Sequence, residues 1–150
     1  FKKGDIDGSV KFFDEAINLE TDNAKKADNA YKAASVLASA KKLSQARSYA
    51  QKAISFNENF GAPYILIAQL YAGNYKWNDE PALNKCTFFA AIDKLQRAKA
   101  VDPSVAEEAN KLISSYSAYT PEAKDLFMLG YKAGDRITIG GWIGETTTIR

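Results

Sequence analysis

The feature that most constrains this chain is that its sequence repeats. Three segments end in a similar way, in SVKFFDEAINLE, ARSYAQKAISFNE and AIDKLQRAKAVDP. In each, small or larger apolar residues recur at steps of four and then three, which places them on one face of a helix. These residues are Ser9, Phe13 and Ala16, then Ala46, Ala50 and Ala53, and then Ala91, Leu95 and Ala98. Such periodicity is typical of stacked helical units.

The helices that precede the second and third of these segments also correspond. AYKAASVLASA and YILIAQLYAG align at an offset of 34 residues, with Ala30 at the position of Tyr64. Small residues such as Ala34 allow two antiparallel helices to approach closely, and larger ones such as Leu37 and Tyr71 fill the space between successive pairs. Because one pair cannot bury its apolar face alone, we expect the pairs to stack.

An offset of 34 residues is the period of the tetratricopeptide repeat, and the residues at these positions resemble that family. The Trp, Leu, Gly and Tyr of its first helix are similar to Tyr64, Ile67, Ala68 and Tyr71. The Ala, aromatic and Ala of its second helix, with the Pro that follows, are similar to Ala91, Leu95, Ala98 and Pro103. The resemblance covers about residues 1–120 and is clearest over residues 30–103. It implies an all-α fold, a right-handed solenoid of tetratricopeptide-type helical hairpins, which a short C-terminal β-hairpin or extended segment would follow.

We predict two regions, repeats over residues 1–120 and a terminal helix with a β-like segment over residues 121–150. The first divides into a half repeat (1–21), a repeat (22–59), a repeat with an insertion (60–103) and a capping helix (104–120). The half repeat resembles a second helix preceded by the turn Gly4-Asp5, without the first helix of its pair. We therefore expect the C-terminal part of a longer repeat protein. The alternative is a natural N-terminus formed by a capping helix.

The third repeat is 11 residues longer than the family period, and the excess lies in AGNYKWNDEPALNKCTFF. Asp79 as N-cap and Pro81 in the first turn predict one long second helix that runs to Val101. Tyr75 and Trp77 would then lie on an exposed turn, where aromatic side chains can anchor a partner. The alternative is that both fold back onto the long helix.

The end of the chain changes in character. Ser104 and Glu107 have the spacing of a capping box and predict one more helix. Thr120 is the expected cap of a last helix, which Gly134 would end. The final stretch, DRITIGGWIGETTTIR, alternates as two short strands around a glycine-containing turn. Because an isolated hairpin is barely stable, we expect Trp142 and the isoleucines to pack against the last helices. The alternative is an exposed strand edge that pairs with a partner.

The sequence contains no catalytic constellation. It has no His, which removes the commonest general base and the usual zinc ligand. Cys86, beside Phe88 and Phe89, is expected to be a small buried hydrophobe. The 20 basic and 18 acidic residues are too balanced to favour nucleic acid or an anionic membrane as partner. No apolar run reaches transmembrane length. We predict a protein that is not an enzyme, with no cofactor, no metal and no inserted membrane segment.

The resemblance also implies a concave groove lined by the first helices of the repeats. Some family members hold the C-terminal carboxylate of a chaperone there, through a Lys and an Asn. The corresponding positions here are Tyr31, Ser35 and Ala38 in one repeat, and Ile65, Gln69 and Ala72 in the next. They do not reproduce that clamp, and favour an extended or helical peptide of mixed polarity. The alternative is a groove filled by the chain's own C-terminal segment. The predicted partner-binding residues are Tyr31, Ser35, Ile65, Gln69, Tyr75 and Trp77.

By resemblance, we expect a scaffold or adaptor that binds a protein or peptide segment. A competing expectation is a structural subunit of a larger complex, which contacts partners through an open N-terminal face and the C-terminal hairpin. A third, an accessory domain of an enzyme, depends on sequence outside this chain. The ending IGGWIGETTTIR is similar to bacterial members of the family, some of which belong to the cell envelope. This favours the envelope or periplasm over the cytoplasm, and composition does not decide between them.

Overall fold

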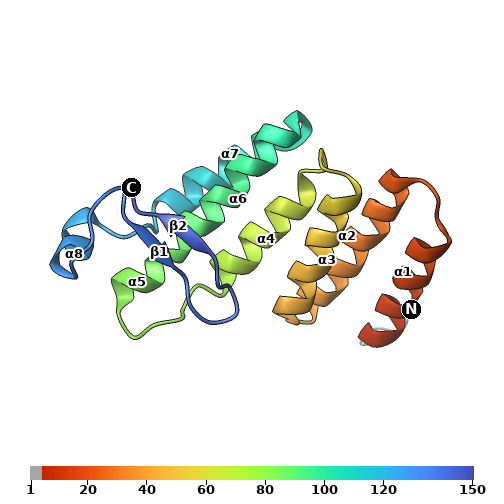
Figure 1. Cartoon of the computed structure of the whole chain (residues 1–150), viewed down its shortest axis with the longest axis horizontal. Coiled ribbons are helices and arrows are strands. Elements are labelled where there is room, and N and C mark those ends of the chain that lie inside the picture. Colours follow the sequence, from red (N-terminus) through yellow and green to blue (C-terminus); the bar gives the residue numbers. More distant parts are fainter. Residues whose placement is uncertain (1–4) are drawn as a thin grey trace.

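The structure is a row of antiparallel helices that ends in a two-stranded hairpin (Figure 1). It is a computed structural model that describes residues 5–150. The helices are α1 (Ile6–Leu19), α2 (Asn23–Ser39), α3 (Leu43–Phe56), α4 (Ala62–Gly73), α5 (Pro81–Lys85), α6 (Thr87–Val101), the 3₁₀ turn η1 (Pro103–Val105), α7 (Ala106–Ser117) and α8 (Ala123–Met128). The strands are β1 (Arg136–Thr138) and β2 (Thr146–Thr148). The helical body and the strand-like ending confirm the coarse prediction from sequence.

The first described residue caps α1. The Asp5 carboxylate accepts a hydrogen bond from the Gly8 N–H (3.0 Å), which satisfies one of the free donors of the first turn. The prediction that Gly4 opens this turn lies outside the described residues.

Successive helices pack in pairs through small side chains. α2 lies against α3, and α4 lies against α6. Across the first interface Ala30 clusters with Ala53, and Leu37 clusters with Ala46. The three alanines are fully buried. A methyl side chain lets two helix backbones approach closely, so the alanine spacing that repeats along the sequence sets the distance within each pair.

A hydrogen bond between two loops links the start of α4 to the end of α6. The Gly61 N–H, ahead of α4, donates to the Asp102 carboxylate, behind α6, at 2.9 Å. A Cβ atom at Gly61 would lie 2.5 Å from the Val105 side chain and 2.8 Å from Asp102 Cβ, too close for either to remain in place. Glycine is therefore required here by close approach.

The insertion forms two helices, not the one long helix that the sequence predicted. α5 follows Glu80, not Asp79, as its N-cap residue. At the break, the Cys86 N–H donates to the Leu83 carbonyl (3.1 Å) and the Phe89 N–H donates to the Cys86 carbonyl (3.0 Å). These bonds span three residues, the pattern of a 3₁₀ turn, which interrupts the α-helical ladder.

Two later caps also differ from prediction. Asp102 accepts hydrogen bonds from the Ser104 N–H (3.1 Å) and hydroxyl (2.6 Å), so Ser104 belongs to η1 and does not cap α7. The Thr120 hydroxyl donates back to a carbonyl at the end of α7 (2.9 Å) and does not cap α8. α8 is short, and Gly130, at φ +94°, follows it well before Gly134. In both places the hydroxyl bonds to a residue two or three positions earlier in the chain, the Asp102 carboxylate for Ser104 and a backbone carbonyl for Thr120.

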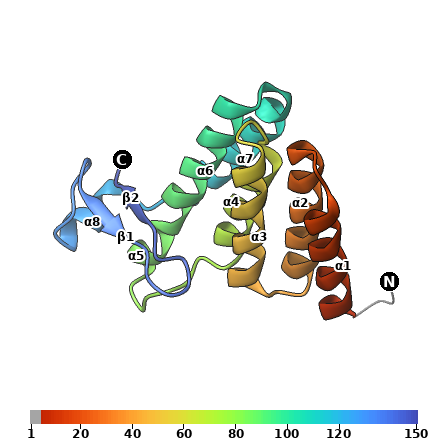
Figure 2. The ribbon, with the colours of Figure 1, turned by 45° about the vertical axis from the view of Figure 1, so that its right-hand side comes forward.

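The terminal hairpin packs along α6 (Figure 2). Its antiparallel register pairs Arg136 with Thr148, Ile137 with Thr147, and Thr138 with Thr146. Alternation turns Ile137 and Thr147 toward the helices, where both are buried. Ile139, Ile143 and Ile149 are buried as well. The hairpin therefore packs on the helical body with its apolar face occupied, but on α6, and with Trp142 on Tyr71 of α4, rather than on the last helices that the sequence predicted.

Candidate functional site

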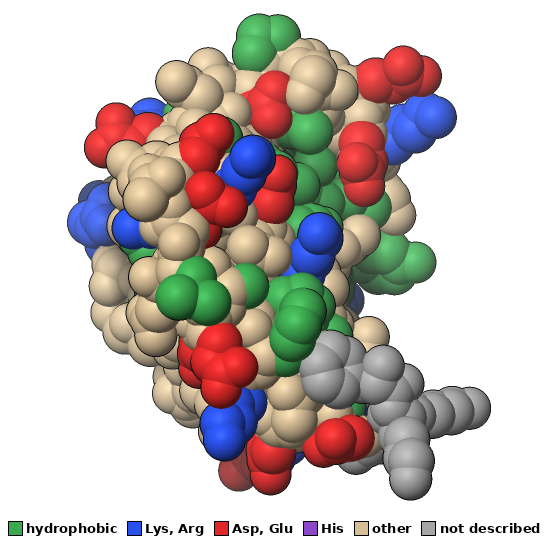
Figure 3. Space-filling model, turned by 90° about the vertical axis from the view of Figure 1, so that its right-hand side faces the viewer, with side chains coloured by type: hydrophobic (Ala, Val, Ile, Leu, Met, Phe, Trp, Pro, Cys, Tyr) green, Lys and Arg blue, Asp and Glu red, His purple; other side chains and the backbone are tan. Residues whose placement is uncertain are grey.

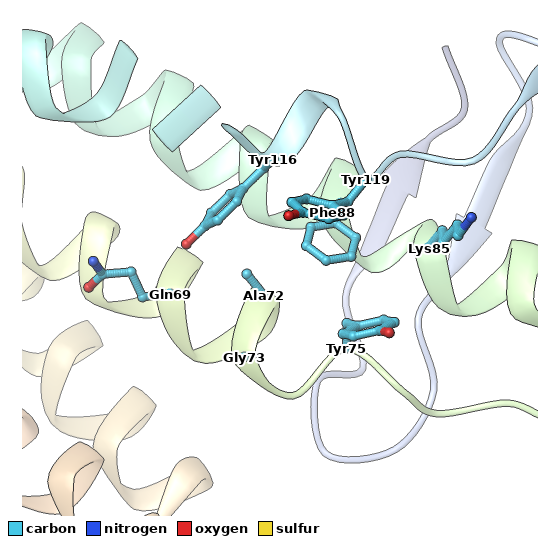
Figure 4. Close-up of a pocket in the computed structure, with 8 residues that line it drawn as sticks. All are labelled: Gln69, Ala72, Gly73, Tyr75, Lys85, Phe88, Tyr116 and Tyr119. Atoms are coloured by element: carbon cyan, nitrogen blue, oxygen red, sulfur yellow. The ribbon is translucent and has the colours of Figure 1, made fainter. Parts of the chain in front are cut away.

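A cavity of about 460 Å³ opens where α4 and α7 flank the start of α6 (Figure 4). Its walls come from three parts of the chain that lie far apart in sequence. The lining residues are Gln69, Ala72, Gly73, Tyr75, Lys85, Phe88, Tyr116 and Tyr119. Four of these are aromatic, and the lining is predominantly apolar, as is usual for sites that bind small molecules or peptide side chains.

One buried phenylalanine organises the aromatic walls. Phe88 is 6 % exposed, and the centre of its ring lies 5.1 Å from that of Tyr75, 5.9 Å from that of Tyr116 and 5.5 Å from that of Tyr119. Tyr119 stacks on it while remaining 57 % exposed. Figure 4 shows Ala72 below the space between Tyr116 and Phe88, where its short side chain leaves the cavity open.

The polar groups of the cavity are few. Burial raises the pKa of the Tyr116 hydroxyl above its ordinary value, so the group stays protonated and can donate a hydrogen bond. Gln69 is exposed at the edge and offers an amide. Among the described residues that line the cavity, Lys85 is the one that carries a charge. No carboxylate of residues 5–150 forms an ion pair with Lys85.

The turn that carries Tyr75 is held by side-chain hydrogen bonds. The Thr87 hydroxyl donates to the Tyr75 carbonyl (2.9 Å). The Asn84 amide oxygen accepts from the N–H groups of Trp77 (2.8 Å) and Asn78 (2.7 Å). This turn is therefore an ordered wall of the cavity rather than a free loop.

The predicted partner-binding residues divide into two sets. Gln69 and Tyr75 line the cavity. Tyr31 does not: it is half-buried, with its ring centre 5.4 Å from that of Phe60. The Ser35 hydroxyl donates to the Tyr31 carbonyl (3.0 Å) within α2.

Two further predicted residues face the body of the protein. Ile65 was expected at the groove, but it is 4 % exposed and belongs to the main hydrophobic cluster, so a partner cannot reach its side chain. Trp77 is half-buried, and its ring lies against Gly140 of the C-terminal segment, where a Cβ atom would come within 2.7 Å of it. Tyr75 packs on Phe88 and Trp77 packs on the C-terminal segment. Neither aromatic protrudes, but only Tyr75 folds back onto a helix as the alternative had it, since Trp77 packs on the C-terminal segment instead.

Six cavity residues were not among the predicted partner-binding residues, although Ala72 was expected at the groove. They are Ala72, Gly73, Lys85, Phe88, Tyr116 and Tyr119. The sequence signal was available in part, because Tyr116 and Tyr119 are three residues apart and share one side of the chain at the end of α7. The sequence did not indicate that α7 packs close to the start of α6.

The C-terminal segment does not fill the cavity, since none of residues 121–150 lines it. It is bound elsewhere, by Arg47 of α3. The Arg47 guanidinium donates to the carbonyls of Ile143 (2.6 Å) and Trp142 (2.7 Å) and to the Tyr71 hydroxyl (3.0 Å), and it lies over the Trp142 ring. The alternative of a self-filled groove therefore does not hold for this cavity.

Further contacts tie the same segment to α6. The Thr147 hydroxyl donates to the Asp93 carboxylate (2.6 Å), which Arg150 also contacts. Lys94 and Glu145 form an ion pair at 2.6 Å. These bonds place the segment along α6 and leave the tyrosine-lined cavity free.

The remaining chemistry of the chain is sparse. Cys86 is fully buried, and burial raises the pKa of its thiol to about 11, so the reactive thiolate is disfavoured. Within residues 5–150, no three His, Cys, Asp or Glu side chains gather as metal ligands would. In the same part of the chain, no helix has the length and apolar character needed to cross a membrane. No family model matches the sequence, and no curated protein matches it.

Proposed function

We propose that this chain is a non-catalytic interaction module of the tetratricopeptide-repeat type, a right-handed solenoid that binds a peptide segment of a partner protein. The support for the fold type is the 34-residue offset together with the alanine-lined pairing of α2 with α3. The observation that carries the function is the open, tyrosine-lined cavity between α4, α6 and α7.

The cavity has the properties of an anchor site. Its volume of about 460 Å³ is large enough to take one or two side chains of a bound peptide. Tyrosine offers a large, rigid contact area that loses little conformational entropy on binding, and a hydroxyl that can hydrogen-bond to a peptide backbone. Beyond the exposed Gln69, the bound segment would continue along α4 toward α2.

Photo-crosslinking tests this proposal. A photoreactive amino acid at Gln69, which is exposed at the edge of the cavity, is introduced into the protein in its native source, and captured proteins are identified by mass spectrometry. We expect one protein to be captured, and its capture to be lost with Tyr119→Ala, which removes a wall, and with Ala72→Leu, which fills the space. Lys25→Ala on α2 is the control, since this side chain is also exposed but lies outside the cavity. Capture that persists in both cavity variants would contradict the proposal.

A second candidate function is that of an assembly segment in a larger complex. It is favoured by apolar side chains that are exposed at the two ends of the row. Leu19 is 85 % exposed on α1, and Met128 is 85 % exposed on α8 beside the exposed Phe127. Figure 3 looks onto the α1 end and shows hydrophobic side chains among charged ones. The hairpin contributes less than expected, because its apolar face is already packed.

Variants at the two ends of the row separate the two candidates. If the chain is an assembly segment, Leu19→Glu and Met128→Glu should release it from its complex, while Tyr119→Ala leaves the complex intact. Co-purification of the tagged full chain followed by size-exclusion chromatography measures this. Retention of the complex by both end variants would count against the assembly function.

A further inference from the structure

The tyrosine-lined cavity carries information about the chemistry of its ligand. We propose that it takes a peptide in which a proline or aromatic side chain stands next to an acidic residue, with the ring in the cavity and the carboxylate paired with Lys85. This inference rests on the proposed function, and it goes further by naming the class of partner sequence.

The shape of the cavity favours a flat or ring-shaped anchor. Four aromatic rings border it: the buried Phe88, on which Tyr119 stacks, with Tyr75 and Tyr116 beside it. Stacked or edge-on contacts between rings are more favourable than contacts of a ring with a flexible chain of equal area. Proline also docks well in aromatic-lined grooves, because its ring is rigid and the extended chain around it is pre-ordered.

The positive charges beside the cavity favour a peptide with an acidic residue next to the anchoring side chain. Lys85 is exposed at the side of the cavity, where Figure 4 shows its ammonium extending away from the aromatic rings, and it forms no ion pair with any carboxylate of residues 5–150. Lys76 adds a second positive charge, with its ammonium 6.0 Å from the centre of the Tyr75 ring. An aromatic pocket can also hold a quaternary ammonium group, but two lysines and the lack of a lining carboxylate oppose a cationic ligand.

The surroundings of Lys85 also restrict where the acid can stand. On its other side, Lys85 borders a hollow that Glu80 and Asp125 line. A peptide carboxylate that reached into that hollow would meet two like charges. The acidic residue should therefore be adjacent to the anchor, within one or two positions, so that it meets Lys85 from the cavity side.

A peptide array tests the proposal directly. Immobilised nine-residue peptides in a Gly/Ser background carry Pro, Tyr, Leu or Ser at the centre, with Asp, Ser or Lys one or two positions away on either side. Binding of the labelled full chain is quantified for each peptide. We expect the strongest signals from Pro or Tyr centres with an adjacent Asp, and a preference of about fivefold for Asp over Lys, the size of one exposed ion pair gained and one repulsion avoided.

Variants then assign the preference to Lys85. With Lys85→Glu, the flanking preference should reverse toward Lys while the preference for Pro or Tyr at the centre is kept. Lys25→Glu, at an exposed position on α2, is the matched control and should leave both preferences unchanged. Equal binding of Asp-flanked and Lys-flanked peptides, no effect of Lys85→Glu, or no binding to any peptide of the array would overturn the ligand class.

If the cavity is not the binding site, the peptide array gives a different result from the one expected for a wrong ligand class. In that case the array signals of the wild type persist unchanged in Tyr119→Ala and Ala72→Leu, because the peptides bind outside the cavity. A loss of signal in these two variants without any acidic preference overturns the ligand class and leaves the cavity as the binding site.

Discussion

At the scale of single residues, close packing decides which substitutions this chain tolerates. The two glycines at the ends of α4 differ sharply in this respect. A Cβ atom at Gly61 would collide with Val105 and Asp102, whereas one at Gly73 would meet no atom within 4 Å. Neither glycine has a positive φ, so the difference is one of space alone.

Gly61→Ala should therefore destabilise the protein by about 1–3 kcal/mol, the range for overpacking a filled site. Gly73→Ala, its matched control, should leave the stability unchanged or raise it by up to about 1 kcal/mol, because alanine is the better helix former. Urea denaturation followed by circular dichroism measures both free energies of unfolding. Equal losses in the two variants would show that close approach at Gly61 is not the cause.

Asp102 gives a second prediction at this scale. Hydrogen bonds from the Ser104 hydroxyl and the Gly61 N–H hold the pKa of the Asp102 carboxyl below its ordinary value. A group whose pKa is lowered on folding stabilises the folded state above its unfolded pKa, and this stabilisation is lost as the pH falls through the folded pKa. Asp102→Asn should therefore cost about 1 kcal/mol at pH 7. That difference from wild type should shrink as the pH falls below the ordinary pKa of Asp, about 4, toward the lower pKa of the folded protein.

Urea midpoints measured at pH 7, 5, 4 and 3 check the Asp102 prediction. Asp28→Asn, at an exposed position on α2, is the control and should change the midpoint little at any pH. A difference between Asp102→Asn and wild type that stays constant down to pH 3 would be inconsistent with a role for the charged carboxylate.

At the scale of elements, the alanine-rich pairs could be predicted from sequence and the insertion could not. The small-residue spacing over α2 and α3 repeats because the same close packing recurs. In the insertion, Asp79 and Pro81 gave a helix start that was correct within one residue. The break at Cys86 lies beside tertiary contacts of the turn, such as that of Thr87 with Tyr75, which have no local signature in the sequence.

The candidate site was predictable to a similar extent. Gln69 and Tyr75 were identified because they lie on one repeat and its turn. Tyr116 and Tyr119 join them only through the packing of α7 on α6, and the burial of Ile65 likewise depends on how the pairs stack. Periodicity places a residue on a face of its own helix, but it does not say which neighbour covers that face.

The C-terminal segment is an element whose position depends on Arg47. Arg47→Ala removes hydrogen bonds to three acceptors, two of them backbone carbonyls of the segment. It should cost about 3 kcal/mol, since hydrogen bonds from a charged group are among the stronger ones. The segment should then detach more often, and limited trypsin digestion should cleave after Arg136 faster than in wild type. Arg97→Ala, exposed on α6, is the control. Unchanged cleavage in Arg47→Ala would show that α6 alone holds the segment.

At the scale of the whole molecule, a row of helices differs from a globular domain because each helix packs mainly on its neighbours in the row. α1 packs on α2, and the ends of the row expose apolar side chains such as Leu19. Stability in such an array is roughly a sum of local terms, so the ends should open before the middle. One side-chain bond reaches from α1 past its neighbour, since the Tyr49 hydroxyl on α3 donates to both oxygens of the Asp14 carboxylate (2.8 Å each).

This arrangement predicts a local effect of Tyr49→Phe. Removing the hydroxyl deletes one hydrogen bond to a carboxylate and should cost about 1 kcal/mol, which corresponds to a roughly fivefold faster amide exchange in α1. Amides of α6 at the centre of the row should exchange at the wild-type rate, because the bond holds only the end helix. Hydrogen exchange resolved by mass spectrometry over peptides from α1 and α6 measures this. Tyr64→Phe serves as the control, because its hydroxyl makes no hydrogen bond with another side chain among the described residues. If exchange accelerated equally in α1 and α6, the row would unfold as one cooperative unit, and the ends would not be available to open or to join a neighbouring unit independently of the cavity.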